Sequence, residues 1–293
     1  MPKKIGIITD VHGLYEPLEA VLMDMEKRGI DKKYSLGDNL GVGPNPKEVL
    51  DLLNKYNVIS IAGNSEDYVT LGIQPFDYFD TLKQKSYFWT LSKITNEQIS
   101  NIKLYPHFIE LSIGGQSLAL CHFANDVRFD YGINSTWNYQ HNYHLGKPAW
   151  QQFLYTNSDK QKEEIKRITE NNINNSSLAG YQSAKKEPLF SGKTVLNYDA
   201  IIQGHVHFKM YEQSDKTKFF TLRALAMGYQ QHEKHTASYV MLTETASGYD
   251  LKEILVFYDR EKMINSIIKS DIPEKEKMLQ FTSVSTEERS KIR

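Results

Sequence analysis

The segment Lys4–His12, which reads KIGIITDVH, decides how this chain is expected to fold. Its isoleucine-rich start and the carboxylate at Asp10 are typical of a buried strand that delivers an acidic side chain at its carboxyl end. A helix is expected next, because apolar residues recur at helical spacing and Gly29 provides a stop. These apolar residues are Leu18, Val21, Leu22 and Met25.

The same order of elements repeats twice along the next residues. Residues 34–36 read as a second strand that ends at Gly37-Asp38, and residues 58–62 read as a third that ends at Gly63-Asn64. Val49, Leu50, Leu52 and Leu53 predict the intervening helix. Alternation of strands and helices indicates a parallel sheet, and ligands of such sheets bind outside the carboxyl ends of the strands. Asp10, Asp38 and Asn64 all fall there.

From about residue 108 the pattern changes to consecutive strands. Residues 108–112 and 117–122 flank Gly114-Gly115, which predicts a hairpin. Further strands are expected at residues 200–202, 218–222, 239–242 and 251–257, in a second sheet, and a helix after Tyr258-Asp259. We expect residues 1–293 to form one domain, with a cap-like insertion at about 123–198 and a surface tail at about 274–293.

Composition narrows the classes of partner. The 293 residues include 35 Lys+Arg and 36 Asp+Glu, so the net charge of −1 gives no general attraction to nucleic acids or anionic membranes. Cys121 is the single cysteine, which excludes an internal disulfide. The apolar stretch before Asp10 is too short for a signal peptide or a membrane span, so we expect a cytoplasmic protein.

Five short segments place potential metal ligands beside glycines or at strand ends. In an extended backbone, residues i and i+2 face the same side, so Asp10 with His12, and His205 with His207, can each converge on one ion. Oxygen and imidazole ligands suit manganese, iron, cobalt or zinc. The segments supply Asp10, His12, Asp38, Asn64, His122, His205 and His207.

This series of segments, D-x-H, G-D, G-N, H and G-H-x-H, resembles the calcineurin-like metallophosphoesterase family. The resemblance implies an α+β fold, a four-layer αββα sandwich of two mixed sheets flanked by helices. It implies two divalent or trivalent metal ions, manganese and/or iron. One ion would be bound by Asp10, His12 and His207, the other by Asn64, His122 and His205, and Asp38 would bridge them. The catalytic residues would be Asp38, Asn64 and His205.

Each ligand taken alone has an ordinary structural use. A histidine such as His122 is more often a core or surface residue, Asp10 could cap the following helix, and Asn64 could sit in a turn. We favour the metal site because the whole set occurs in the order of the family.

Two departures from the family pattern bear on the substrate. Ser65 stands where the family usually has a histidine thought to protonate or stabilise the leaving oxygen, and a serine hydroxyl is too weak an acid for that work. Leaving groups that are stable anions, as in phosphoanhydrides and aryl esters, are therefore expected. Alternatively another group takes over the role, or catalysis is weaker. The second departure follows the last histidine pair, where many relatives carry an asparagine-proline-glycine-serine turn and this chain has Arg223-Ala-Leu-Ala-Met-Gly228. Arg223 could contact phosphate there or could serve packing.

The order of the segments looks most like the compact bacterial branch of the family, which includes phosphodiesterases and asymmetrical diadenosine tetraphosphate hydrolases. We therefore expect a small phosphoester or nucleotide substrate, with diadenosine tetraphosphate the first to test. Aromatic residues of the insertion could stack on a base or form its own core: Phe129, Tyr131, Trp137, Tyr139 and Tyr143. The alternatives are a phosphoprotein phosphatase of the same fold and a non-catalytic metal-binding scaffold. The oligomeric state is not predicted.

Overall fold

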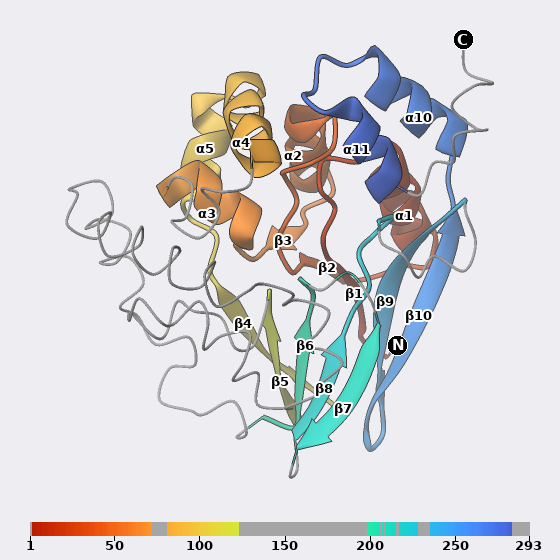
Figure 1. The fold of residues 1–293 in the computed structure, drawn as a ribbon. Helices are drawn as coiled ribbons and strands as arrows, with labels where there is room; N and C mark the ends of the chain where they lie inside the picture. Colours follow the sequence, from red (N-terminus) through yellow and green to blue (C-terminus); the bar gives the residue numbers. More distant parts are fainter. Residues whose placement is uncertain are drawn as a thin grey trace.

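The structure is a computed structural model that describes residues 2–71, 81–122, 198–205, 207, 209–214, 217–227 and 235–282. The described residues form two five-stranded sheets that face each other (Figure 1). The expected insertion at 123–198, with its aromatic residues, lies almost wholly outside the described residues. The single-domain organisation stays a prediction.

The first sheet has the strand order β10-β9-β1-β2-β3. β1 pairs in parallel with β2, and β2 with β3, whereas β9 runs antiparallel to both β1 and β10. The parallel half therefore presents the carboxyl ends of three strands at one edge, as the sequence predicted. Its strands are β1 Lys4–Ile8, β2 Lys32–Ser35, β3 Ile59–Ser60, β9 Thr236–Thr245 and β10 Gly248–Phe257.

The second sheet has the order β4-β5-β6-β8-β7 and is also mixed. The predicted hairpin forms between β4 and β5, and β6 pairs in parallel with β5 and β8. Its strands are β4 Phe108–Ile113, β5 Gln116–Cys121, β6 Ala200–Gln203, β7 Met210–Ser214 and β8 Thr217–Thr221.

Apolar packing fixes the layers. One cluster of buried residues fills the space between the sheets, including Ile5 and Ile7 of β1 and Leu118 and Leu120 of β5. A second cluster lies on the outer face of the first sheet, under α1 Tyr15–Lys27, α2 Pro46–Lys55 and α10 Arg260–Lys269. The apolar stripes that predicted these helices are the faces that they bury. The predicted α+β fold of two mixed sheets flanked by helices is confirmed.

Four helices among the described residues had no counterpart in the sequence prediction. Three follow the third strand: α3 Asn64–Leu71, α4 Thr81–Lys93 and α5 Asn96–Ile102. α5 begins with a capping box in which the Thr95 side chain accepts from the Gln98 backbone N–H and the Gln98 side chain accepts from the Thr95 N–H. In Figure 1 these helices lie beyond the carboxyl ends of β1, β2 and β3.

The fourth is α11 Lys275–Phe281, in the segment that was expected to be a surface tail. That expectation is wrong for residues up to Thr282, because Met278 and Leu279 are buried in the helical layer of the first sheet. Burial of two apolar side chains outweighs the charges around them, which remain on the solvent side. Among the described residues, none of the helices combines the length and apolar character that crossing a membrane would need.

Candidate metal centre

The sequence-predicted ligands meet at one end of the sandwich, each just beyond or at the end of a strand. Hydrogen bonds between the connecting loops hold them together: the Asp10 N–H donates to the Gly37 carbonyl at 3.0 Å, and the His12 N–H to the Asp38 carbonyl at 2.9 Å. From the second sheet, the Gly204 N–H donates to the His122 carbonyl at 2.9 Å. Both sheets therefore contribute to one site.

The backbone at this site is strained. Seven non-glycine residues among those described have positive φ, and five belong to the predicted ligand set: Asp10, His12, Asp38, His205 and His207, with φ between 51° and 75°. Left-handed backbone costs a non-glycine residue about 1–3 kcal/mol and is found where function requires it. The rest of the fold holds these side chains in place against that cost.

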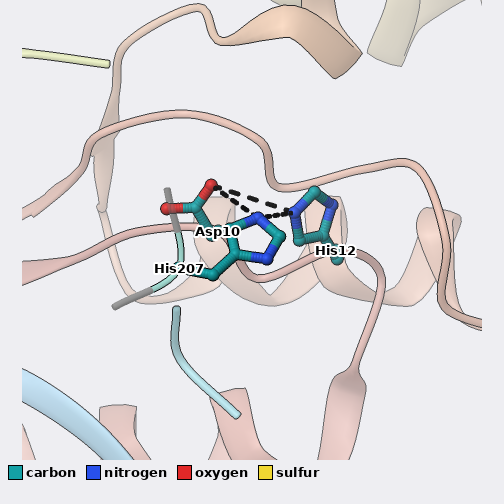
Figure 2. A group of neighbouring side chains, drawn as sticks. All are labelled: Asp10, His12 and His207. Atoms are coloured by element: carbon teal, nitrogen blue, oxygen red, sulfur yellow. Dashed lines mark hydrogen bonds and ion pairs between the residues drawn. The ribbon is translucent and has the colours of Figure 1, made fainter. Parts of the chain in front are cut away.

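Asp10, His12 and His207 form the first group of ligands (Figure 2). The Nε2 atoms of the two histidines are 3.0 Å apart. Asp10 Oδ1 lies 3.4 Å from His207 Nε2 and 3.8 Å from His12 Nε2. Asp10 is fully buried, and its Oδ1 has no hydrogen-bond partner. A buried carboxylate oxygen that faces two imidazole nitrogens is a suitable environment for a cation.

Asp38, His122 and His205 form the second group. His205 Nδ1 lies 3.2 Å from His122 Nε2, which is 3.5 Å from Asp38 Oδ2. Asn64 reaches this group from the start of α3, with its Nδ2 3.4 Å from His205 Nδ1. A half-turn of the Asn64 amide would present Oδ1, which can bind a metal, in place of that nitrogen.

Asp38 lies between the two groups. Its Oδ2 is 3.5 Å from His122 Nε2 in the second group and 3.9 Å from His12 Nε2 in the first. Its Oδ1 accepts the Ser65 backbone N–H at 2.8 Å. One oxygen is thus anchored to the backbone while the other faces both sets of histidines, which is the position that a bridging ligand requires.

Contacts behind the ligands orient them toward the shared space. His12 Nδ1 lies 3.1 Å from the Leu40 carbonyl, and His122 Nδ1 lies 2.9 Å from the Leu36 carbonyl. A carbonyl only accepts, so each Nδ1 must carry the proton, and each Nε2 lone pair is left to bind a metal. The donor set therefore fits two metal ions.

Asp10 is anchored in the same way as Asp38. Its Oδ2 accepts from the Thr9 hydroxyl at 2.7 Å and from the His205 N–H at 2.9 Å, which leaves Oδ1 toward the histidines.

Glu66 is a buried support that the sequence prediction left without a role. Its carboxylate accepts the backbone N–H groups of Asp38, Asn39 and Gly63, each at 2.9 Å. The loops that carry Asp38 and Asn64 are thereby tied to one side chain. One signal in the sequence could have found it, since Glu66 stands two residues after Asn64 in the same motif.

The electrostatics of the site follow from burial and from the crowding of like and unlike groups. Burial alone would raise the pKa values of Asp10 and Asp38, but the adjacent histidines bring both below the usual aspartate range. Burial, then the charge of His122, lowers the pKa of His205 to about 3. His12 shifts downward for similar reasons, through burial and His207. At neutral pH the centre thus offers ionised carboxylates and, at His12 and His205, neutral imidazoles, which are the metal-binding forms, whereas, despite burial, the charge of Asp10 raises the pKa of His207.

A cavity of about 270 Å³ opens beside the ligands. It reaches His12, Asp38, Asn64, His205 and His207, and it extends away from them under α3, α4 and the end of α11. Ser65 lines it, so the position of the missing histidine faces open space. His122 does not line the cavity and is fully buried.

Arg223 lies elsewhere. Its Nε is 2.7 Å from Glu253 Oε1 on β10, and it lines a different cavity, between the two sheets. Of the two uses considered for it, the structure supports packing and ion pairing.

Comparison with known proteins identifies the family. Residues 3–209 match the sequence profile described as calcineurin-like phosphoesterase, which is more than half of the chain. The chain belongs to this family. The matched range contains all seven predicted ligands. The prediction made from the motifs is confirmed at the level of the family.

Individual relatives add detail. The chain is 38% identical over 118 residues to the uncharacterized protein MJ0912 of Methanocaldococcus jannaschii, a match covering 40% of this chain and 48% of that protein. It is 27% identical over 129 residues to serine/threonine-protein phosphatase 2 of Escherichia coli, covering 41% and 58%. The chain thus matches about half the length of these curated relatives.

The crystal structure of the hypothetical protein PH1004 from Pyrococcus horikoshii OT3 superposes with a TM-score of 0.62 at 16% identity, covering 95% of this chain and 97% of that one. At this identity the similarity supports the fold alone.

Proposed function

We propose that this protein is a dinuclear metal-dependent phosphoesterase that hydrolyses phosphoanhydrides or activated phosphodiesters. The observation that carries the proposal is the pair of ligand groups with Asp38 between them. In this proposal Asp10, His12 and His207 bind one ion, Asn64, His122 and His205 bind the other, and Asp38 bridges them. Asp38, Asn64 and His205 are the residues proposed to act in catalysis, because all three line the cavity in which a substrate would meet the ions.

Two ions bound here would lower the pKa of a water molecule and neutralise charge on the phosphoryl group. The protein's own contribution is position. Anchored oxygens of Asp10 and Asp38 fix the carboxylates, and the carbonyls of Leu36 and Leu40 fix the imidazole orientation. Two ligand carboxylates balance only half of the charge of two divalent ions, so the loaded centre stays attractive to a phosphate anion.

The leaving group is the point at which this site departs from a general phosphatase. Ser65 lines the cavity, and among the described lining residues outside the ligand set no histidine, lysine or arginine is available to give a proton to a departing alkoxide. Substrates whose leaving group is already a stable anion do not need that proton. This supports phosphoanhydrides and aryl phosphodiesters, with diadenosine tetraphosphate as a first natural candidate.

The test combines metal analysis with a substrate series. The purified protein is assayed for bound metals, then offered bis(p-nitrophenyl) phosphate, diadenosine tetraphosphate and a phosphoserine peptide, with added manganese or iron. We expect two metal ions per chain and turnover of the first two compounds well above that of the peptide. A metal-loaded protein inert toward all of them would refute the proposal.

A phosphoprotein phosphatase is the second candidate, and the similarity to the Escherichia coli protein named serine/threonine-protein phosphatase 2 favours it. Preference for the phosphopeptide in the same series would establish it. A non-catalytic scaffold ranks lower, because all seven ligand positions are occupied by residues that can bind a metal. The choice of manganese or iron and the cytoplasmic location remain predictions.

A further inference from the structure

The cavity beside the ligand groups has a polar floor, formed by the candidate metal ligands, and walls formed mainly by apolar and aromatic side chains. Helices from three separate parts of the chain supply the walls: α3 contributes Tyr68 and Val69, α4 contributes Tyr87, and α11 contributes Phe281. Leu40, Val42 and Met227 complete the apolar lining. In Figure 1 the three helices lie on the same side of the first sheet, beyond its strand ends.

The floor of the cavity is the candidate metal centre itself, so anything held between the walls would lie next to the phosphate site. Small residues keep open the space between the floor and the walls. Gly41 has φ +118°, and a Cβ there would come within 3.2 Å of Ser65 Oγ and 3.3 Å of His12 Nδ1. Ser65 is only 7% exposed and occupies little of the space that a histidine would fill.

The described walls carry no positive charge that could pair with a phosphate group. None of the described lining residues is lysine or arginine, and Asp38, on the floor, is the sole lining carboxylate among them. A second phosphate group would therefore find no cation there, and leaving an anion unpaired against apolar walls is costly. An uncharged ring would instead gain from apolar burial and from edge or face contacts with aromatic side chains.

The size of the cavity sets a further limit. Its volume of about 270 Å³ is at or just below the lower end of ligand pockets in general, which span about 300–1,000 Å³. It suits one ring-sized group rather than a second nucleotide.

We propose that this cavity is a subsite for a single uncharged, ring-shaped apolar substituent of the phosphoester, an aryl group or a nucleobase. The inference rests on the proposed function, because the phosphate is taken to bind at the adjacent metal centre. It narrows the substrate class to a phosphate that carries one such ring close to the reacting bond. Long polyphosphate chains, that of diadenosine tetraphosphate included, fit the described walls poorly, so among the substrates proposed above the subsite favours aryl phosphodiesters.

Binding measurements test the subsite without requiring turnover. Phenylphosphonate and methylphosphonate carry the same charged group and differ by the ring. Titrated calorimetrically into the manganese-loaded protein, the phenyl compound should bind about tenfold or more tightly, the gain expected from burying one ring. Equal affinities, or no binding of either compound, would overturn the proposal.

A variant pair locates the effect. Phe281→Ala removes a wall residue that is 41% exposed, so folding should be little affected. The matched control is Phe257→Ala, at the end of β10, which is 73% exposed and does not line the cavity. The preference for phenylphosphonate should fall about threefold in Phe281→Ala and stay unchanged in Phe257→Ala. An unchanged preference in both variants would show that the ring binds elsewhere.

Turnover of bis(p-nitrophenyl) phosphate by the same preparations separates the two proposals. If the phenyl preference and its loss in Phe281→Ala are seen without turnover, the subsite stands and the proposed function fails. If turnover is seen without a phenyl preference, the opposite holds.

Discussion

The floor and the walls of the cavity are built by different means. The floor consists of buried and half-buried polar side chains, most of them on strained backbone, and its two carboxylate residues are anchored by hydrogen bonds such as that from the Ser65 N–H to Asp38 Oδ1. The walls come from helices held by apolar packing, such as that of Met278 and Leu279, and their polar links are exposed. Lys93 Nζ lies 2.7 Å from Asp271 Oδ2, and Trp89 Nε1 lies 3.1 Å from Asp271 Oδ1. Exposed contacts of this kind contribute little to stability.

This contrast suggests a division of labour. Strained backbone and buried hydrogen bonds hold the reacting groups, whereas helices held by apolar packing and exposed polar links surround the substituent that the phosphate carries. Changes in the floor should impair the hydrolysis of every substrate. Changes in the walls should alter only the preference among substrates.

The largest effect should come from the residue between the ligand groups. Asp38→Asn replaces a charged oxygen that faces both histidine sets, and we expect metal content to fall and kcat/KM to drop more than about hundredfold for all substrates. Metal analysis and kinetics on the same samples measure this. Asp250→Asn, an exposed position on β10, serves as the control. Full metal content and full turnover in Asp38→Asn would show that the bridging assignment is wrong.

A steric change in the floor should come next. A Cβ on Gly63 would lie 2.5 Å from both the backbone N and Oδ1 of Asp38, so Gly63→Ala must displace that loop. A displacement of about 1 Å can cost about hundredfold in rate, which is the loss we expect in kcat/KM.

Gly29→Ala provides the contrast, because φ is +61° there but a Cβ would meet nothing within 4 Å. It should lower stability by about 1–2 kcal/mol and leave the rate unaltered. Similar kinetics in the two alanine variants would refute a steric role for Gly63.

Glu66→Gln should have a smaller effect, through the loops rather than through direct contact. Glu66 Oε2 accepts two N–H groups and Oε1 one, and a glutamine amide nitrogen cannot accept at all. One or two buried N–H groups would lose their partner, at about 1–3 kcal/mol in the free energy of unfolding. Metal affinity should fall about 10- to 100-fold.

Denaturant unfolding and metal titration measure both quantities for Glu66→Gln. Glu97→Gln, at an exposed position in the first turn of α5, should change neither. If Glu66→Gln also left stability and metal affinity unchanged, Glu66 would not support the ligand loops as proposed.

The same contrast explains what the sequence could reveal. Strands and ligands were predictable because a strand period, a glycine and a ligand at the strand end occur together at Asp10, Asp38 and Asn64. The walls had no such pattern. In α4 the aromatic residues Tyr87, Phe88 and Trp89 are consecutive, so they point around the helix and form no apolar stripe. In α11 only Met278 and Leu279 are buried, directly after three charged residues.

Glu66 was visible in the sequence, but two of its three hydrogen bonds reach backbone groups 27 and 28 residues away and depend on the folded structure. Long-range contacts of this kind produce no periodic pattern in the neighbouring sequence.

The smallest expected effect concerns the protonation of His205, which belongs to the floor of the cavity. In the metal-free protein, burial and His122 lower the pKa of His205 to about 3, whereas in the unfolded chain its pKa is near 6.5. As pH falls below 6.5 the unfolded chain takes up a proton that the folded protein does not, so stability decreases with acid, down to about pH 3. At pH 5.5 this amounts to roughly 1.4 kcal/mol from His205 alone. His12 acts in the same direction, and His207, whose pKa is raised, acts in the opposite one.

Denaturant unfolding of metal-free protein at pH 7.5 and 5.5 should show this loss of stability, and His205→Asn should show less of it. A loss of equal size in that variant would mean that His205 is free to take up its proton in the folded state, and so is not held neutral for metal binding.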